Sequence, residues 1–344
     1  MATEVESAWS PAKRFTLVKP TFKGLEQAFI PNPARSGHGP VSLSGNGDLA
    51  VLGNPAYPWS GATIHHRENS AWSLKATISE GISYVSGRAT DYAMGSSVWF
   101  FPDGDAFLIG SQAENDDTVT VGVESWSRVR KFQKQTLVSW TGSVEYPEIS
   151  GSTYRFMNSS ADSPHYYHQL SGVGWVSVFG GSYQTTTPPT VSADGTMGGV
   201  SIPLESKIAA VKKVGSSYNV IQNIVTTAGV VAISYDGSIM INGYGDGVDF
   251  YSWSGASWIF TRRVTLSFGG YIGLMKMSKD TKTIAIAGSS YAVVLKNVNG
   301  SWIEVPLSPP SSVFDLAISQ DGSTVAISGS WNGWNGPTGW KIFV

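Results

Sequence analysis

The sequence predicts an all-β protein, a seven-bladed β-propeller with four antiparallel strands in each blade. A short turn motif recurs seven times along the 344 residues, at intervals of 41 to 57 residues. An aromatic residue follows most of these turns at about the distance of one hairpin. The chain also has 39 glycines and 13 tryptophans but only 14% charged residues, which suits many short strands joined by tight turns.

The turn motif is a Ser-x-Asp-Gly string between two apolar strands. Its clearest copies begin at Ser234 and Ser319, and weaker copies begin at Ser44, Phe101, Ser150, Ser192 and Ser278. Serine and aspartate side chains bond to nearby backbone groups in a turn, and glycine accepts a positive φ. The motif is therefore interpreted as structural, with no ligand required.

The aromatic motif is a small polar turn followed by Trp or Tyr. Its six copies place the aromatic residue at Trp72, Trp126, Trp175, Tyr218, Trp258 and Trp302. Each is expected to open the fourth strand of a blade and to pack between neighbouring blades.

The two ends of the chain complement each other. The last repeat stops at residues 340–344, one strand short, while Ser7-Ala-Trp9-Ser10 repeats the aromatic motif before the first turn. We therefore expect a strand at about residues 8–18 to pair with residues 340–344, so that residues 1–344 form one closed domain. Closure leaves no strand edge open to aggregation.

Composition excludes several classes of function. The chain has no cysteine, so disulfides and thiolate chemistry are excluded, and its net charge of -2 does not favour nucleic acid. No stretch approaches the roughly 18 apolar residues of a membrane helix, so membrane insertion is not expected. The N-terminus does not resemble a secretory signal, which favours export within a virus particle, or a cytoplasmic location if the protein is not viral.

The strings Leu49-Ala-Val-Leu-Gly-Asn-Pro55 and Gly61-Ala-Thr-Ile-His65, with Ser70-Ala-Trp72, resemble the FG-GAP repeat of integrin-like β-propellers. The resemblance implies a platform for adhesion and recognition. Calcium-binding members carry several aspartates at alternating positions, and this chain departs from that pattern. No cofactor is expected, and Asp246 and Asp249 are the nearest approach to a calcium loop.

A ligand site is predicted where long aromatic loops of the first and seventh blades become neighbours through ring closure. The predicted site residues are Tyr57, Trp59, Trp331, Asn332, Trp334 and Asn335, and Asn54 is a further hydrogen-bonding neighbour. Exposed aromatic rings with amide neighbours suit sugars and also serve as hot spots for proteins.

Catalysis is not expected. Glu145, Glu148 and Asp315 are the carboxylates expected on innermost strands, but the first two point to different faces of one strand. Histidine pairs such as His65-His66 and His165 with His168 also point apart. We therefore expect a virus or phage spike that contacts a host-surface glycan or protein, with other virion proteins as partners. The alternatives are a lectin or interaction scaffold unrelated to a virus, and a propeller that cleaves glycosides.

Overall fold

The structure is a computed structural model of the chain. It describes residues 22–31, 39–54, 61–78, 84–85, 88–89, 97–100, 106–112, 119–127, 133–140, 144–150, 153–160, 163–171, 174–181, 190–215, 217–267, 270–289, 291–308, 310–331 and 338–344.

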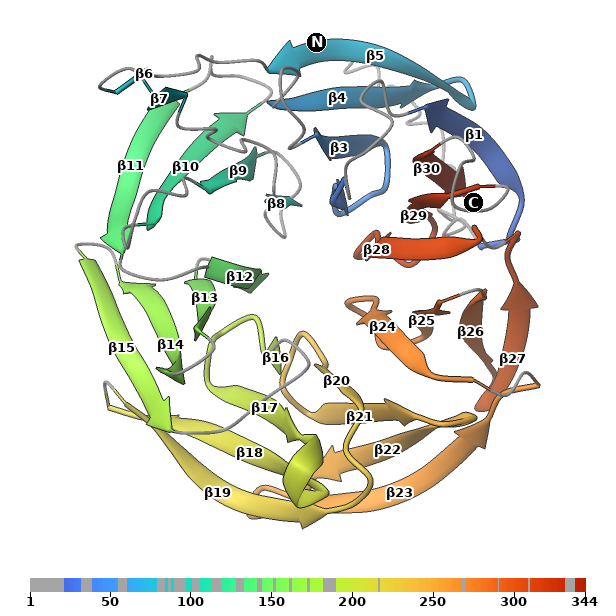
Figure 1. The fold of residues 1–344 in the computed structure, drawn as a ribbon. Coiled ribbons are helices and arrows are strands. Elements are labelled where there is room, and N and C mark those ends of the chain that lie inside the picture. Colours follow the sequence, from blue (N-terminus) through green and yellow to red (C-terminus); the bar gives the residue numbers. More distant parts are fainter. Residues whose placement is uncertain are drawn as a thin grey trace, which may run out of the picture.

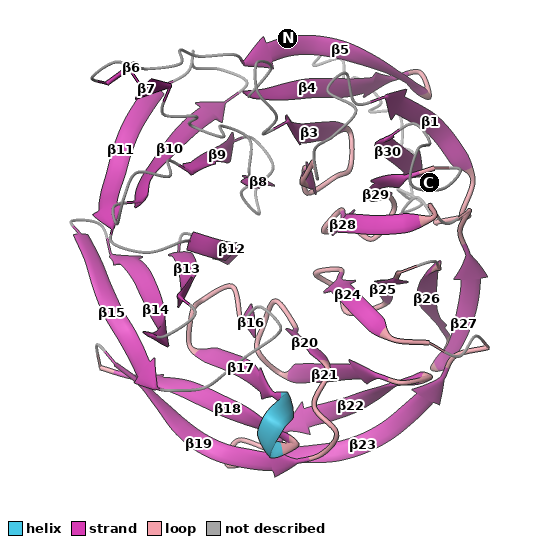
Figure 2. Cartoon of the chain, viewed as in Figure 1, coloured by secondary structure: helices cyan, strands magenta, loops and turns pink. Residues whose placement is uncertain are grey.

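The described residues form an all-β structure of four-stranded antiparallel sheets, seven in number, with one two-stranded ribbon (Figure 2). Three sheets from the first half of the chain are each built from four consecutive strands. They comprise β2 (Val41–Leu43), β3 (Leu49–Asn54), β4 (Gly61–Glu68) and β5 (Ala71–Ile78); β8 (Ser97–Phe100), β9 (Ala106–Gln112), β10 (Val119–Ser127) and β11 (Gln133–Trp140); and β12 (Val144–Ser150), β13 (Thr153–Ser160), β14 (Ser163–Ser171) and β15 (Gly174–Gly181). The ribbon is β6 (Tyr84–Val85) with β7 (Arg88–Ala89).

Three sheets from the second half follow the same consecutive order. They comprise β16 (Thr190–Val191), β17 (Met197–Ile202), β18 (Lys207–Val214) and β19 (Ser217–Val225); β20 (Val230–Ile233), β21 (Ile239–Tyr244), β22 (Gly247–Trp253) and β23 (Trp258–Thr265); and β24 (Ile272–Met277), β25 (Thr283–Gly288), β26 (Ala292–Val298) and β27 (Ser301–Pro306). A 3-10 helix, η1 (Pro203–Glu205), connects β17 to β18.

The remaining sheet combines both ends of the chain in the order β1 (Glu26–Pro31), β30 (Thr338–Phe343), β29 (Val325–Ser330) and β28 (Ser312–Ile318). The sheets stand around a common centre, as in a β-propeller (Figure 1). Strands such as β8, β12, β24 and β28 lie towards the centre, whereas β5, β11, β15, β19, β23, β27 and β1 lie outside.

The strand that completes the mixed sheet differs from the one expected. Glu26 of β1 lies opposite Phe343, and Pro31 lies opposite Gly339. The other side of β30 is paired with β29, so β1 occupies the position expected for residues 8–18. Residues 8–18 themselves lie outside the described residues.

The Ser-x-Asp turns have the local structure expected from their sequence. In the copy at Ser234, the serine hydroxyl donates to Asp236 Oδ1 at 2.6 Å and accepts the Ile239 N–H at 2.9 Å. Asp236 Oδ1 also accepts the Ser238 N–H at 3.0 Å. The copies at Ser192, Ser278 and Ser319 repeat these bonds, so the motif is satisfied within the turn.

Hydrogen bonds also join the turns of neighbouring sheets. The Ala193 N–H donates to the Tyr235 carbonyl at 2.8 Å, and the Lys279 N–H donates to the Gln320 carbonyl at 2.8 Å. The same link joins the sheet that contains the C-terminus to the sheet β2–β5, from the Asp321 N–H to the Gly45 carbonyl at 3.1 Å. Adjacent sheets are therefore tied to each other by backbone bonds at this end.

The hydrophobic core lies between adjacent sheets. One cluster joins Ile241 and Phe250 to Ile284 and Leu295 of the next sheet, and Trp302 packs against it with its ring centroid 5.1 Å from that of Phe250. Trp258 and Trp72 occupy equivalent positions in two other clusters. The expected packing role of these recurring aromatic residues is thus confirmed for Trp72, Trp258 and Trp302.

Trp126 departs from this pattern. It lies in β10, the third strand of its sheet, because β10 continues to Ser127 and pairs with β9 as far as Ala106. The fourth strand, β11, begins only at Gln133, so Trp126 does not open it.

Gly322 lies where two turns of neighbouring sheets pack closely against each other. Its φ is +69°, and an added Cβ would lie 2.6 Å from Thr283 Oγ1 in the neighbouring sheet. Gly300 also has a positive φ, of +89°, but an added Cβ meets nothing within 4 Å.

We predict that Gly300→Ala costs about 1 kcal/mol of unfolding free energy and that Gly322→Ala costs roughly 1–3 kcal/mol more, measured by urea denaturation. Equal losses would show that backbone conformation alone matters at Gly322.

Candidate functional site

Three connections between strands begin at the same end of two neighbouring sheets. These are the sheet β2–β5 and the mixed sheet of β1, β30, β29 and β28. The connections follow β1 at Pro31, β3 at Asn54 and β29 at Trp331, and they return at Gly39, Gly61 and Thr338. The Trp340 indole N–H donates to the Gly39 carbonyl at 3.2 Å. The Gly53 N–H donates to the Pro40 carbonyl at 2.9 Å, so the described ends of the connections lie side by side. We call this surface the loop sector, defined by Phe29, Gly39, Asn54, Trp331 and Thr338.

Gly39 allows the two sheets to approach closely in the loop sector. A Cβ added to Gly39 would lie 2.5 Å from Cζ2 of Trp340 and 2.6 Å from the Gly53 carbonyl oxygen. Because a real Cβ essentially never comes that near, any other residue would push Trp340 away from β3. Glycine is therefore required here for a close approach, independently of its backbone freedom.

Trp331 forms the base of the loop sector. Its side chain is packed edge-on against Phe29, with ring centroids 6.1 Å apart, and Lys341 Nζ lies 4.2 Å from its ring centroid. Lys341 is held in turn by Glu26 of β1 at 2.9 Å. Trp331 is only 6% exposed whereas Phe29 is 39% exposed. Trp331 thus lies beneath the surface, and Phe29, which was not among the six predicted site residues, reaches solvent.

Several buried polar atoms of the loop sector have no hydrogen-bond partner among the described residues. They are Asn54 Oδ1, Trp331 Nε1 and Thr338 Oγ1. Leaving a buried donor or acceptor unpaired costs about 1–3 kcal/mol. The base of the loop sector therefore carries an energetic cost that better-satisfied parts of the scaffold avoid.

The sequence-predicted site is described only in part. Trp331 and Asn54 are the described residues of this set, and both are buried at the start of a connection. Tyr57, Trp59, Asn332, Trp334 and Asn335 lie outside the described residues. The connections that carry them begin and end at the loop sector, and their role in binding stays a prediction.

The two aspartates nearest to a calcium loop contact an arginine instead. Arg263 donates to Asp249 Oδ1 at 2.9 Å and to Asp246 Oδ1 at 3.0 Å. Within the described part of the chain, no cluster of three or more His, Cys, Asp or Glu side chains has the arrangement to hold a metal ion. Asp246 and Asp249 therefore act as partners of a guanidinium.

His65 and His66 have structural surroundings. His65 is buried, its Nε2 lies 3.2 Å from Thr63 Oγ1, and burial lowers its pKa. His66 points the other way, with Nδ1 2.8 Å from Glu68 Oε1. The pair does not converge on one point, which agrees with the expectation from strand alternation.

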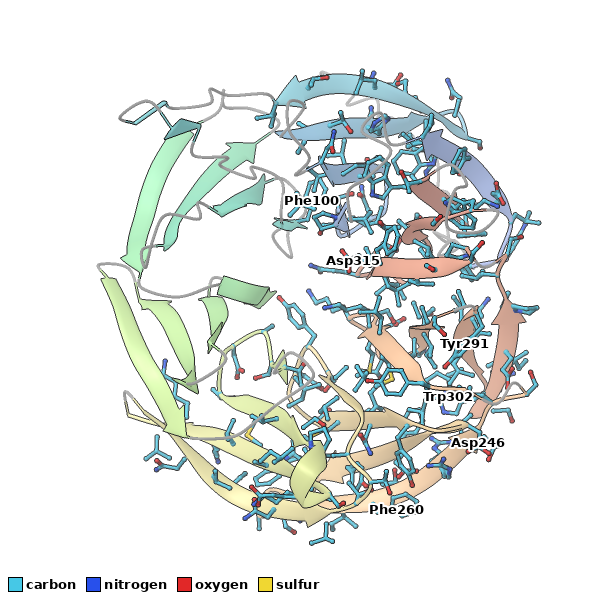
Figure 3. The ribbon with its side chains drawn as sticks, viewed as in Figure 1. Phe100, Asp246, Phe260, Tyr291, Trp302 and Asp315 are labelled. Atoms are coloured by element: carbon cyan, nitrogen blue, oxygen red, sulfur yellow. The ribbon has the colours of Figure 1, made fainter. Side chains whose placement is uncertain are left out.

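Asp315 links two sheets at the centre of the molecule (Figure 3). Its carboxylate accepts the Val41 N–H of β2 at 2.8 Å and the Leu316 N–H of its own strand at 2.8 Å. Burial raises the pKa of this carboxyl, against the opposing effects of the two hydrogen bonds and of Lys276. The expected carboxylate on an innermost strand is present, but its contacts are those of a link between sheets.

The raised pKa of Asp315 makes the stability of the protein depend on pH. The pKa of Asp315 is higher in the folded protein than in the unfolded chain. Its contribution to the unfolding free energy is therefore greatest below pH about 3.8, where the carboxyl is protonated in both states. It is lost as the pH rises through the folded pKa. We predict that the unfolding free energy of the wild type, relative to that of Asp315→Asn, decreases between pH 3.5 and 7 in urea titrations. A constant difference across this range would contradict the burial of a titrating carboxyl.

Comparison with known proteins does not assign the chain to a family, because no family model and no curated protein matches the sequence significantly. Among the described residues, no helix has the length and apolar character needed to span a membrane.

Proposed function

We propose that this chain is a single seven-bladed β-propeller domain that acts as a non-catalytic recognition module, the receptor-binding spike of a virus or phage. Its ligand is a glycan or protein on the host surface, bound at the loop sector. The observation that carries the proposal is the convergence of three connections at the described ends of β1, β3 and β29. In a scaffold of short, satisfied turns, such connections are where binding function is expected.

A closed ring is supported by links between the first and last parts of the chain. The β1–β30 pairing places the N-terminal strand in the C-terminal sheet, and the Asp321–Gly45 bond joins that sheet to β2–β5. A rigid ring suits recognition because its loops are held in place before the ligand arrives.

Recognition rather than catalysis is supported by the contacts of Asp315, the candidate catalytic carboxylate whose contacts are described. Its carboxylate accepts hydrogen bonds from two backbone N–H groups. The aromatic residues of the three connections supply the stacking surfaces that sugars and protein partners use. Display on a particle brings many copies to the host surface, so modest affinity per copy suffices.

The proposal predicts that removing two aromatic side chains from the connections weakens ligand binding but leaves thermal stability nearly unchanged. In Trp59→Ala, Trp334→Ala, binding to a host-cell or glycan panel falls by roughly tenfold or more, because two aromatic contacts are removed. The melting temperature changes by less than about 2 °C, because surface substitutions outside the core cost little. Glycan arrays and cell binding measure the first effect, and calorimetry measures the second.

Tyr271→Ala is the matched control, since Tyr271 is an exposed aromatic residue that precedes β24, in a sheet that contributes no residue to the loop sector. It should leave binding unchanged. A double variant that binds as well as the wild type, or that loses much of its thermal stability, would contradict the proposal.

A further inference from the structure

A groove lies on the outer side of the molecule, between strand β19 and the neighbouring sheet β20–β23. It is open to solvent, with a volume of about 560 Å³, and its lining includes Asn223, Thr226, Tyr244, Asp249, Phe260 and Arg263. The strands that form the groove lie across the ring from β1 and β30, so it is separate from the loop sector (Figure 1).

Phe260 supplies an apolar surface in the groove. Its ring is 54% exposed, and Tyr251 supports it in an edge-on contact with centroids 5.8 Å apart (Figure 3). An exposed aromatic face of this kind gains free energy when an apolar surface covers it. The groove therefore favours a ligand with an apolar face.

Arg263 and Asp249 place hydrogen-bond donors beside acceptors in the same groove. The guanidinium bonds to Asp249 and Asp246 and stacks over the Tyr244 ring, 4.4 Å from its centroid. The single positive charge thus faces two carboxylates, so the site has no excess positive charge to attract an anion. Such a pair instead suits hydroxyl groups, each of which both donates and accepts.

Contacts across the two sheets fix the shape of the groove. The Gln222 side chain of β19 accepts the Trp258 N–H at 2.7 Å and donates to the Trp258 carbonyl at 3.1 Å. Trp258 is buried and tilted against Trp253, with centroids 5.5 Å apart. The walls are therefore set before a ligand binds, which lowers the ordering cost of binding.

We propose that this groove binds a neutral pyranose sugar that has adjacent hydroxyl groups. The apolar face of the sugar ring lies on Phe260, and its hydroxyls bond to the Asp249–Arg263 pair and to the Asn223 amide. This site extends the proposed function with a second, independent contact to glycans, on sheets that do not contribute to the loop sector.

The experiment titrates the full-length chain with three neutral oligosaccharides, lactose, maltotriose and cellotriose, and with the anionic 3′-sialyllactose. Ligand-observed magnetic resonance and calorimetry report binding. At least one neutral sugar should saturate below about 10 mM, with no preference for the anionic one. Phe260→Ala should weaken that binding by roughly tenfold.

Ile259→Ala is the matched control, because Ile259 precedes Phe260 in β23, is 53% exposed and does not line the groove. It should change the affinity by less than about twofold. Absence of binding by all three neutral sugars, a preference for 3′-sialyllactose, or equal losses in the two variants would each overturn the inference.

The Trp59→Ala, Trp334→Ala variant separates this inference from the proposed function. Sugar binding in the groove should persist in that variant. If groove binding is absent while the wild type still attaches to host cells through the loop sector, the inference fails and the proposed function stands.

Discussion

The pairing of β1 with β30 is the interaction on which the candidate binding surface depends. It places an N-terminal strand in the C-terminal sheet, with reciprocal backbone bonds of 3.0 Å between Leu25 and Val344 beyond the strand ends. Phe29, the exposed aromatic of the loop sector, lies on β1, and Lys341, which covers Trp331, lies on β30. Without this pairing, the last sheet would end in an open edge and Trp331 would lose its cover.

Neighbouring sheets contact each other through the same few kinds of interaction. At the innermost strands, a side-chain oxygen accepts a backbone N–H of the next sheet: Ser42 from Phe100, Thr190 from Ile233 and Asp315 from Val41. Short inner strands otherwise carry unpaired N–H groups, which are costly when buried. Apolar clusters and hydrogen-bonded turns add further contacts between neighbouring sheets where the structure describes them.

The repeated, local features could be predicted from the sequence, because the residues within each copy of a motif determine its structure. The Ser-x-Asp turns and the packing of Trp258 and Trp302 are of this kind. The strand that pairs with β30 was not predictable in this way, because Glu26–Pro31 lacks the aromatic turn that Ser7-Ala-Trp9-Ser10 has. Burial of Trp331 depends in part on Phe29, which is distant in sequence. The groove joins Asn223 to Phe260 across two sheets, so no local motif marks it.

Amide hydrogen exchange on β1 tests most directly whether the chain ends build the loop sector. Strand β27 is the internal comparison, since both strands are outermost in adjacent sheets and each pairs with one described neighbour. If β1 completes the sheet, the amides of β1 bonded to β30 should exchange as slowly as those of β27 bonded to β26. Exchange of β1 at the rate of an unprotected chain, with β27 still protected, would show that β1 does not complete the sheet and would remove the basis of the loop sector.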